Sequence, residues 1–210
     1  MTLNPLLLYL IQTYTVLAGW ILFAVIFLFR RKQTPEKSKK SEPASIIGII
    51  LQGIALGLVW LRRPPLTPIL PLGVWFEIFA AVLAILLVIA SLWLMSAAVG
   101  ALGKQWSMQA RVLEDHALIR QGPYRIVRHP IYTGLLGMLL AAGLTWSHWI
   151  CFVTSILFFS IGTIIRVRSE EKLLRAEFGA AFDDYARNVP AVIPALLGRK
   201  AFGHPHDRQS

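Results

Sequence analysis

The stretch IYTGLLGMLLAAGLTWSHWICFVTSILFFSIGTII, residues 131–165, decides the fold of this chain. Two apolar arms without charged residues, Ile131–Thr145 and Ile150–Ile165, flank a short turn at residues 146–149. This pattern predicts a helical hairpin. At 1.5 Å per residue, arms of 15 and 16 residues reach only about 23 Å, whereas the hydrocarbon core of a bilayer is about 30 Å thick. The arms therefore cross the membrane only with help from flanking residues, and the tryptophans in the turn favour crossing because tryptophan prefers the headgroup level.

Three further apolar runs precede the hairpin. Leu6–Phe29 contains 24 residues and Ala44–Leu61 contains 18, both without a charge, and Val74–Ala98 carries one acidic residue, Glu77, near its beginning. A spanning helix needs about 20 mostly apolar residues. The sequence therefore predicts an all-α, polytopic membrane protein with about five transmembrane helices. Glu77 is expected to pair with one of the two arginines at residues 62–63, because charges near helix ends usually find a partner at the interface.

The basic residues indicate how these helices are oriented. Residues 30–43 hold six Lys or Arg, residues 100–130 hold five, and the chain from residue 166 onward holds eight, which is 19 of the 21 in the sequence. Cytoplasmic loops collect Lys and Arg. With an odd number of spans, this distribution predicts an N-terminus outside and a cytoplasmic C-terminal helical region.

Composition supports the membrane assignment. Of the 210 residues, 56% are apolar and 15% are charged, against roughly half and a quarter in soluble proteins. The net charge of +10 arises from basic residues next to apolar runs, so we expect the lipid bilayer as a partner and no nucleic acid. The single cysteine, Cys151, leaves no disulfide framework and no cysteine metal site. The first apolar run is too long for a cleavable signal and predicts a retained span.

We expect three regions along the chain. Residues 1–99 form the N-terminal helices one to three, residues 100–198 form a catalytic region that includes the hairpin 131–165, and residues 199–210 form a disordered tail. His204 and His206 flank a proline in that tail, where solvated side chains are expected rather than a metal site.

The polar residues that can carry chemistry lie in two stretches, GPYRIVRHPIYTG at residues 122–134 and residues 166–194, on either side of the hairpin. Because His129 lies 18 residues before Ser147 and Ile165 lies 18 after it, antiparallel arms bring both stretches to one membrane depth. The hairpin mouth then contains three residues from each stretch. They are Arg125, Arg128 and His129, and Arg168, Glu170 and Glu171.

The first stretch predicts a helix start. Pro130 suits the first helical position, which places His129 at the cap beside free backbone N–H groups and the positive end of the helix dipole. An anion would bind well there, and Arg125 and Arg128 add a fork suited to a carboxylate or phosphate. An equal alternative is that these arginines only anchor the chain to anionic headgroups.

The second stretch predicts a helix that leaves the membrane. Adjacent residues on a helix point about 100° apart, so at most one of Glu170 and Glu171 should face the hairpin mouth. The other should form surface pairs, for example Glu171 with Arg175. Farther along, Phe182 and Tyr185 are placed to wall a planar ligand or, as the somewhat favoured alternative, to anchor at the interface.

Together, GPYRIVRHPIYTG and EEKLLRAEFGAAFDDYARNVPAVIP, with the preceding LGKQWS, closely resemble the isoprenylcysteine carboxyl methyltransferase family over residues 100–194. The resemblance implies a membrane methyltransferase that uses S-adenosylmethionine on a helical scaffold. The expected acceptor is a hydrophobic small molecule or a prenylated compound, with O-methylation of an isoprenylcysteine-like carboxylate favoured.

The resemblance also implies roles for individual residues. Glu170 or Glu171 would hold the amino group of the cofactor, and Arg128 and Arg168 would orient an anionic acceptor. The other residues implied in the cofactor pocket are His129, Pro130, Tyr132, Gly134, Gln105, Trp106, Tyr124 and Tyr185. Two positions depart from the family pattern, because Ala191 stands where glycine is usual and Phe182 supplies no hydroxyl.

The acceptor and the enzyme class stay open at this level. A carboxylate acceptor needs no base, an ammonium acceptor needs His129 or a glutamate as base, and a thiol must first become a thiolate. Two other classes of protein are also compatible with such helices. They are a nicotinamide-dependent reductase of the sterol type and a non-enzymatic scaffold that binds anionic lipid.

Overall fold

The computed structural model describes residues 4–31, 40–41, 43–103, 111–112 and 118–194 of the chain. These residues are helical apart from one pair of two-residue strands and the connecting loops, so the all-α prediction is confirmed. The helices are α1 (Pro5–Arg31), α2 (Ala44–Val59), α3 (Val74–Leu102), α4 (Pro130–Trp146), α5 (Trp149–Phe178) and α6 (Ala180–Asn188), with a short 3₁₀ helix, η2 (Gly122–Arg125). The antiparallel strand pair is β1 (Lys40–Ser41) and β2 (Arg111–Val112).

Helices α1, α3 and α5 are long and apolar enough to cross a membrane, and α2 and α4 are shorter apolar helices. These helices make the protein an integral, multi-pass membrane protein. The expected number of five spans and the orientation of the termini stay predictions.

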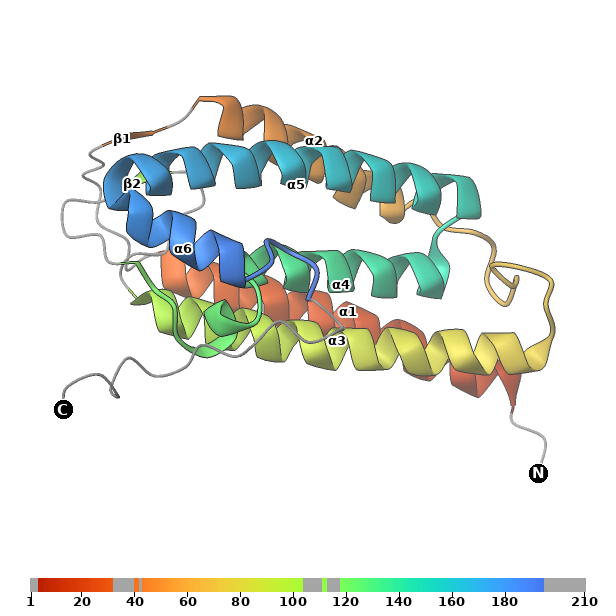
Figure 1. Cartoon of the computed structure of the whole chain (residues 1–210). Helices are drawn as coiled ribbons and strands as arrows, with labels where there is room; N and C mark the ends of the chain where they lie inside the picture. The colour runs from red at the N-terminus through yellow and green to blue at the C-terminus, as the bar shows by residue number, and fades with distance from the viewer. Residues whose placement is uncertain (1–3, 32–39, 42, 104–110, 113–117, 195–210) are drawn as a thin grey trace.

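The hairpin predicted from residues 131–165 is present as α4 and α5, which run antiparallel on either side of a turn at Ser147 and His148 (Figure 1). Its two arms pack against different partners, because α5 lies mainly along α2 and α4 lies mainly along α3. Helix α5 continues without a break from the apolar arm to Phe178. The polar stretch after Ile165 is therefore held rigidly on the same helix as the membrane arm.

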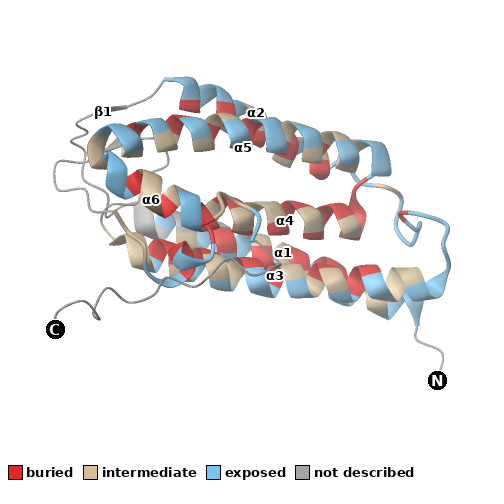
Figure 2. Ribbon diagram, viewed as in Figure 1, coloured by how far each residue is buried: buried red, intermediate tan, exposed pale blue. Residues whose placement is uncertain are grey.

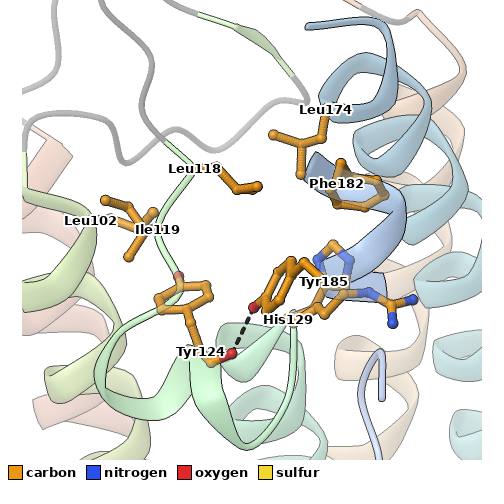
Figure 3. A pocket seen from close by; sticks show the side chains of 9 residues that line it. Leu102, Leu118, Ile119, Tyr124, His129, Leu174, Phe182 and Tyr185 are labelled. Carbon is orange, nitrogen blue, oxygen red and sulfur yellow. Dashed lines mark hydrogen bonds between the residues drawn. The ribbon is translucent and has the colours of Figure 1, made fainter. Parts of the chain in front are cut away.

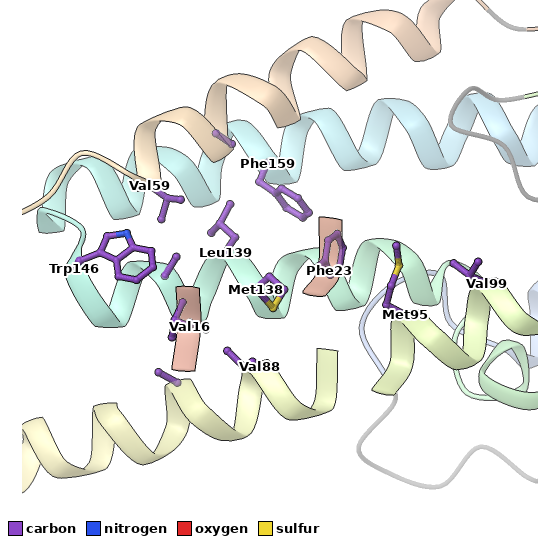
Figure 4. Close-up of a cluster of buried hydrophobic side chains, with 14 residues drawn as sticks. Val16, Phe23, Val59, Val88, Met95, Val99, Met138, Leu139, Trp146 and Phe159 are labelled. Atoms are coloured by element: carbon purple, nitrogen blue, oxygen red, sulfur yellow. The ribbon is translucent and has the colours of Figure 1, made fainter. Parts of the chain in front are cut away.

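Apolar side chains lie both in the core and on the outer surface of the bundle. A buried cluster that includes Val16, Val88, Met138 and Phe159 joins α1, α3, α4 and α5 (Figure 4). The outward faces of the same helices are exposed (Figure 2) and carry large apolar side chains such as Trp75, which is 81% exposed. Such a surface is suited to lipid and poorly suited to water.

The turn of the hairpin is tied to the loop after α2. Arg63 donates from its backbone N–H to Trp146 O at 2.8 Å, and from its guanidinium to Ser147 O at 3.0 Å and Leu144 O at 3.2 Å. These bonds satisfy carbonyls at the C-terminal end of α4. Burial lowers the pKa of Arg63, and the charge of Glu77 partly opposes this. The hydrogen bonds of the Arg63 guanidinium go to main-chain carbonyls, and its expected pairing with Glu77 stays a prediction.

Candidate active site

Helix α4 begins as the sequence predicts, with His129 at the N-cap and Pro130 at the first helical position. The segment just before it pairs with the chain after α6, because Arg128 N donates to Pro190 O and His129 N donates to Ala191 O, each at 2.8 Å. The start of α4 is thereby held against the end of the described C-terminal region.

The imidazole of His129 lies between the two neighbouring glutamates of α5. Its Nδ1 is 3.2 Å from Glu170 Oε2 and its Nε2 is 3.2 Å from Glu171 Oε1. The expectation that at most one of these glutamates faces the hairpin mouth is therefore wrong. The two side chains leave α5 in different directions, but the buried ring sits between those directions and presents one nitrogen to each.

Arg128 holds the second glutamate from another side. Its Nε and Nη2 donate to Glu171 Oε1 at 2.9 and 2.6 Å, while its Nη1 donates to Ala186 O at 2.8 Å and also to Val189 O. The expected pair of Glu171 with Arg175 does not form, because Glu171 turns inward to Arg128. Arg175 instead pairs with Asp183 at 2.7 Å.

The structure brings Arg166 into the site and leaves Arg168 outside it. Arg166 is 8% exposed, its Nη2 lies 3.7 Å from Glu170 Oε1, and its guanidinium lies 4.8 Å from the ring centroid of Tyr132. The hydroxyl of Tyr132 donates to the same oxygen of Glu170. Arg168 is exposed on another face of α5. The i,i+4 spacing of Arg166 and Glu170 was the sequence signal for this pair.

The surroundings of His129 favour its positively charged form. Burial alone would lower the pKa of His129, but hydrogen bonds and charge interactions with Glu170 and Glu171 outweigh burial and raise the pKa. A neutral imidazole has one N–H donor, whereas an imidazolium donates from both nitrogens and matches two carboxylate acceptors. His129 thus serves as a cation that holds both glutamates.

A mostly apolar pocket opens beside this cluster (Figure 3). Tyr185 donates its hydroxyl hydrogen to Tyr124 O at 2.6 Å, which fixes the ring in the pocket wall, and burial raises the pKa of Tyr185. Phe182 and Tyr185, expected either to wall a planar ligand or to anchor at the interface, both line this pocket. Four aliphatic residues also line it, and they carry no polar signal in the sequence. The lining residues are Leu102, Leu118, Ile119, Tyr124, Arg128, His129, Leu174, Phe182 and Tyr185.

Four other predicted residues are not seen in contact with the charged cluster in the described part of the chain. Gly134 lies against α3, since a Cβ at this position would be 3.2 Å from Ser91 O, and its predicted contact with a cofactor stays a prediction. Arg125 is exposed. Gln105 and Trp106 lie outside the described residues.

Residues 82–176 match the profile of the isoprenylcysteine carboxyl methyltransferase family. This part of the chain is similar to that family. The matched residues include α4 and nearly all of α5, with Arg128, His129, Glu170 and Glu171, whereas α2 and α6 lie outside the match.

Three relatives show how far the similarity extends. Methanethiol S-methyltransferase 2 of Bradyrhizobium diazoefficiens is 35% identical over 78 residues, covering 37% of this chain and 29% of the relative. Cobalt-zinc-cadmium resistance protein CzcN of Cupriavidus metallidurans is 29% identical over 140 residues, covering 60% and 64%. Protein-S-isoprenylcysteine O-methyltransferase of Schizosaccharomyces pombe is 31% identical over 86 residues, covering 40% and 35%. The chain thus spans less than two thirds of the length of each.

Proposed function

We propose that this protein is an integral membrane methyltransferase that moves a methyl group from S-adenosylmethionine to a hydrophobic acceptor. The observation that carries the proposal is the cluster of His129 with Glu170, Glu171 and Arg128 at an apolar pocket, inside the region that matches the family. Several charges of both signs are concentrated there, beside the apolar pocket. A ligand that is both charged and partly apolar fits such a place.

The residues at this place fit the proposed donor. S-adenosylmethionine has a planar base, an ammonium, a carboxylate and a positive sulfur, and when bound it supplies an electrophilic methyl group. Tyr124 and Tyr185 offer aromatic walls, Glu170 or Glu171 offers a negative partner for the ammonium, and Arg128 offers a positive one for the carboxylate. The proposed pocket also takes in His129, Pro130, Tyr132 and Gly134 at the start of α4.

The state of His129 favours an acceptor that is already a nucleophile. A base must be free to accept a proton, but His129 is held as a cation between two carboxylates, and those carboxylates are themselves engaged. An ammonium acceptor would lack a base among these residues. A carboxylate needs none, so we assign O-methylation of a lipidic, isoprenylcysteine-like carboxylate as the reaction, with the aliphatic pocket wall contacting the apolar part of the acceptor.

The chain's residues then act by positioning. Holding two reactants in line and at contact removes much of the barrier to a displacement reaction. Arg128, Glu171 and His129 form a rigid cluster because each is tied to at least one other, and this cluster is fastened to α6 through the carbonyls of Ala186 and Val189. Its role is to fix one reactant relative to the pocket.

The first test is binding. Purified protein in detergent should bind S-adenosylhomocysteine in isothermal titration calorimetry, and NADPH should give no heat and no thermal shift. Stabilisation by NADPH alone would favour a reductase instead. Binding of neither, together with salt-sensitive association with anionic vesicles, would favour a lipid-binding scaffold.

The second test identifies the acceptor. S-adenosylmethionine with a labelled methyl group is offered with a prenylated cysteine that has a free carboxylate, its amide, a prenyl thiol and a prenyl amine. We expect label only in the first compound, released by base as methanol because the product is an ester. Label in the thiol alone would overturn the choice of carboxylate and keep the methyltransferase. Glu171→Gln should abolish transfer, while Asp184→Asn on α6, where the side chain is 49% exposed and pairs with Arg187, serves as the matched control.

A further inference from the structure

We propose that Gln52, on α2, is a positioning residue for the active site, because it holds Arg166 where Arg166 supports Glu170. This inference rests on the proposed methyltransferase function. Gln52 lies outside residues 82–176, so the site would depend on a helix that the family match does not include.

The contact begins with two glycines. A Cβ added to Gly48 would lie 2.7 Å from Gly162 O, and a Cβ added to Gly162 would lie 2.8 Å from Gly48 O. The backbones of α2 and α5 therefore touch at this level, as small residues allow between membrane helices. Because α2 and α5 run antiparallel (Figure 1), Arg166 lies opposite Gly48 and Gln52 lies opposite Gly162. The missing side chain at Gly48 leaves room for the arginine, whose guanidinium reaches Gln52.

Hydrogen bonds fix the side chain of Gln52. It is 3% exposed, its Nε2 donates to Thr163 Oγ1 at 2.8 Å, and its Oε1 accepts from Arg166 Nη1 at 3.1 Å. An arginine only donates, so the amide oxygen must face Arg166 and the amide nitrogen must face Thr163. The orientation of the amide is thus determined by both partners together.

Arg166 transmits this placement to the cluster at His129. Its guanidinium lies over the ring of Tyr132 and 3.7 Å from Glu170, and Glu170 in turn contacts His129. Gln52, Arg166, Glu170 and His129 therefore form a continuous chain of contacts from α2 to the start of α4. Loss of the first contact removes one of the bonds that orient the guanidinium and weakens its hold on Glu170.

A second Gln–Thr pair in the bundle provides a matched control. Gln12 Nε2 on α1 donates to Thr145 Oγ1 on α4 at 3.0 Å, and both residues are buried. This pair joins two helices in the same chemical way as Gln52 and Thr163. Thr145 donates to Ala141 O and lies at the other end of α4 from His129, so the pair contacts none of the clustered charges.

The experiment compares Gln52→Leu, Gln52→Glu and Gln12→Leu with wild type in detergent, by the Kd for S-adenosylhomocysteine, the KM for the acceptor and the melting temperature. Gln52→Leu removes a buried bond to a charged group and should raise the Kd about tenfold, with the acceptor KM little changed. Gln52→Glu keeps an oxygen facing Arg166 and should stay within about threefold of wild type. Gln12→Leu should lower the melting temperature without changing the Kd.

Equal Kd values for Gln52→Leu and wild type would overturn the inference, as would equal losses of affinity in Gln52→Leu and Gln12→Leu. If Gln52→Leu does not fold, Thr163→Val decides, because it keeps Gln52 but frees its amide. A raised Kd in that variant supports the inference and an unchanged Kd overturns it. If the wild-type protein neither binds S-adenosylhomocysteine nor transfers a methyl group, the proposed function fails and the inference about Gln52 fails with it. If the wild type is active and the Gln52 variants bind equally well, only the inference about Gln52 fails.

Discussion

Replacement of Glu171 by glutamine removes a negative charge from the most densely bonded oxygen in the site. Glu171 Oε1 lies 2.9 Å from Arg128 Nε, 2.6 Å from Arg128 Nη2 and 3.2 Å from His129 Nε2. The side chains of Glu171 and Arg128 are only 13% and 12% exposed. In this variant His129 keeps one carboxylate partner, Glu170 at its Nδ1.

These contacts set the stability that Glu171→Gln should lose. A hydrogen bond to a charged group contributes about 1.5–3 kcal/mol, and removing one partner of a buried ion pair costs about 3–5 kcal/mol. The glutamine oxygen still accepts from Arg128, so we expect the lower part of this range, about 2–3 kcal/mol in the free energy of unfolding. In a chain of this size each kcal/mol shifts the melting temperature by roughly 2–4 °C.

Thermal unfolding in detergent measures this directly and does not depend on which ligand the protein binds. Glu171→Gln should lower the melting temperature by roughly 5–10 °C. Asp184→Asn breaks an ion pair of the same type on α6, where Arg187 and Asp184 are 3.4 Å apart and 70% and 49% exposed. Exposed pairs contribute about 0–1 kcal/mol, so this control should shift the melting temperature by about 4 °C at most. Equal small shifts in both variants would refute the view that the buried cluster stabilises the fold.

Three further predictions concern the same region. Because the folded-state pKa of His129 is raised, the stabilisation from its charged form is fully present below the unfolded pKa of about 6.5 and is lost as the pH rises through the folded pKa. The difference in melting temperature between wild type and His129→Gln should therefore shrink from pH 6 to pH 9. A constant difference would contradict this. Tyr132→Phe removes the hydroxyl that donates to Glu170 and should weaken S-adenosylhomocysteine binding several-fold in titration calorimetry. Gly48→Ala places a Cβ 2.7 Å from a carbonyl of α5 and should cost about 1–3 kcal/mol by thermal unfolding, whereas Gly53→Ala on the same helix meets no atom within 4 Å and should be neutral or slightly stabilising.

Several features of this protein follow from the sequence alone because they depend on local properties of the chain. The length of the apolar runs predicts the membrane helices, and the two arms around residues 146–149 predict the hairpin. Pro130 predicts the start of α4 with His129 at its cap, since proline is suited to that position alone in a helix. Equal arm lengths then bring the Arg-His-Pro and Glu-Glu segments together, and these are the segments that meet in the structure.

Other features were decided only by tertiary structure. The rotation of α5 about its axis turns Arg166 inward and Arg168 outward, and it lets His129 contact both Glu170 and Glu171. The order of residues along the helix does not determine this rotation. The contact of Gln52 with Arg166 depends on the close approach of two glycines more than a hundred residues apart in the sequence. Such contacts depend on which helix faces pack together, and that packing is determined by all the helices of the bundle.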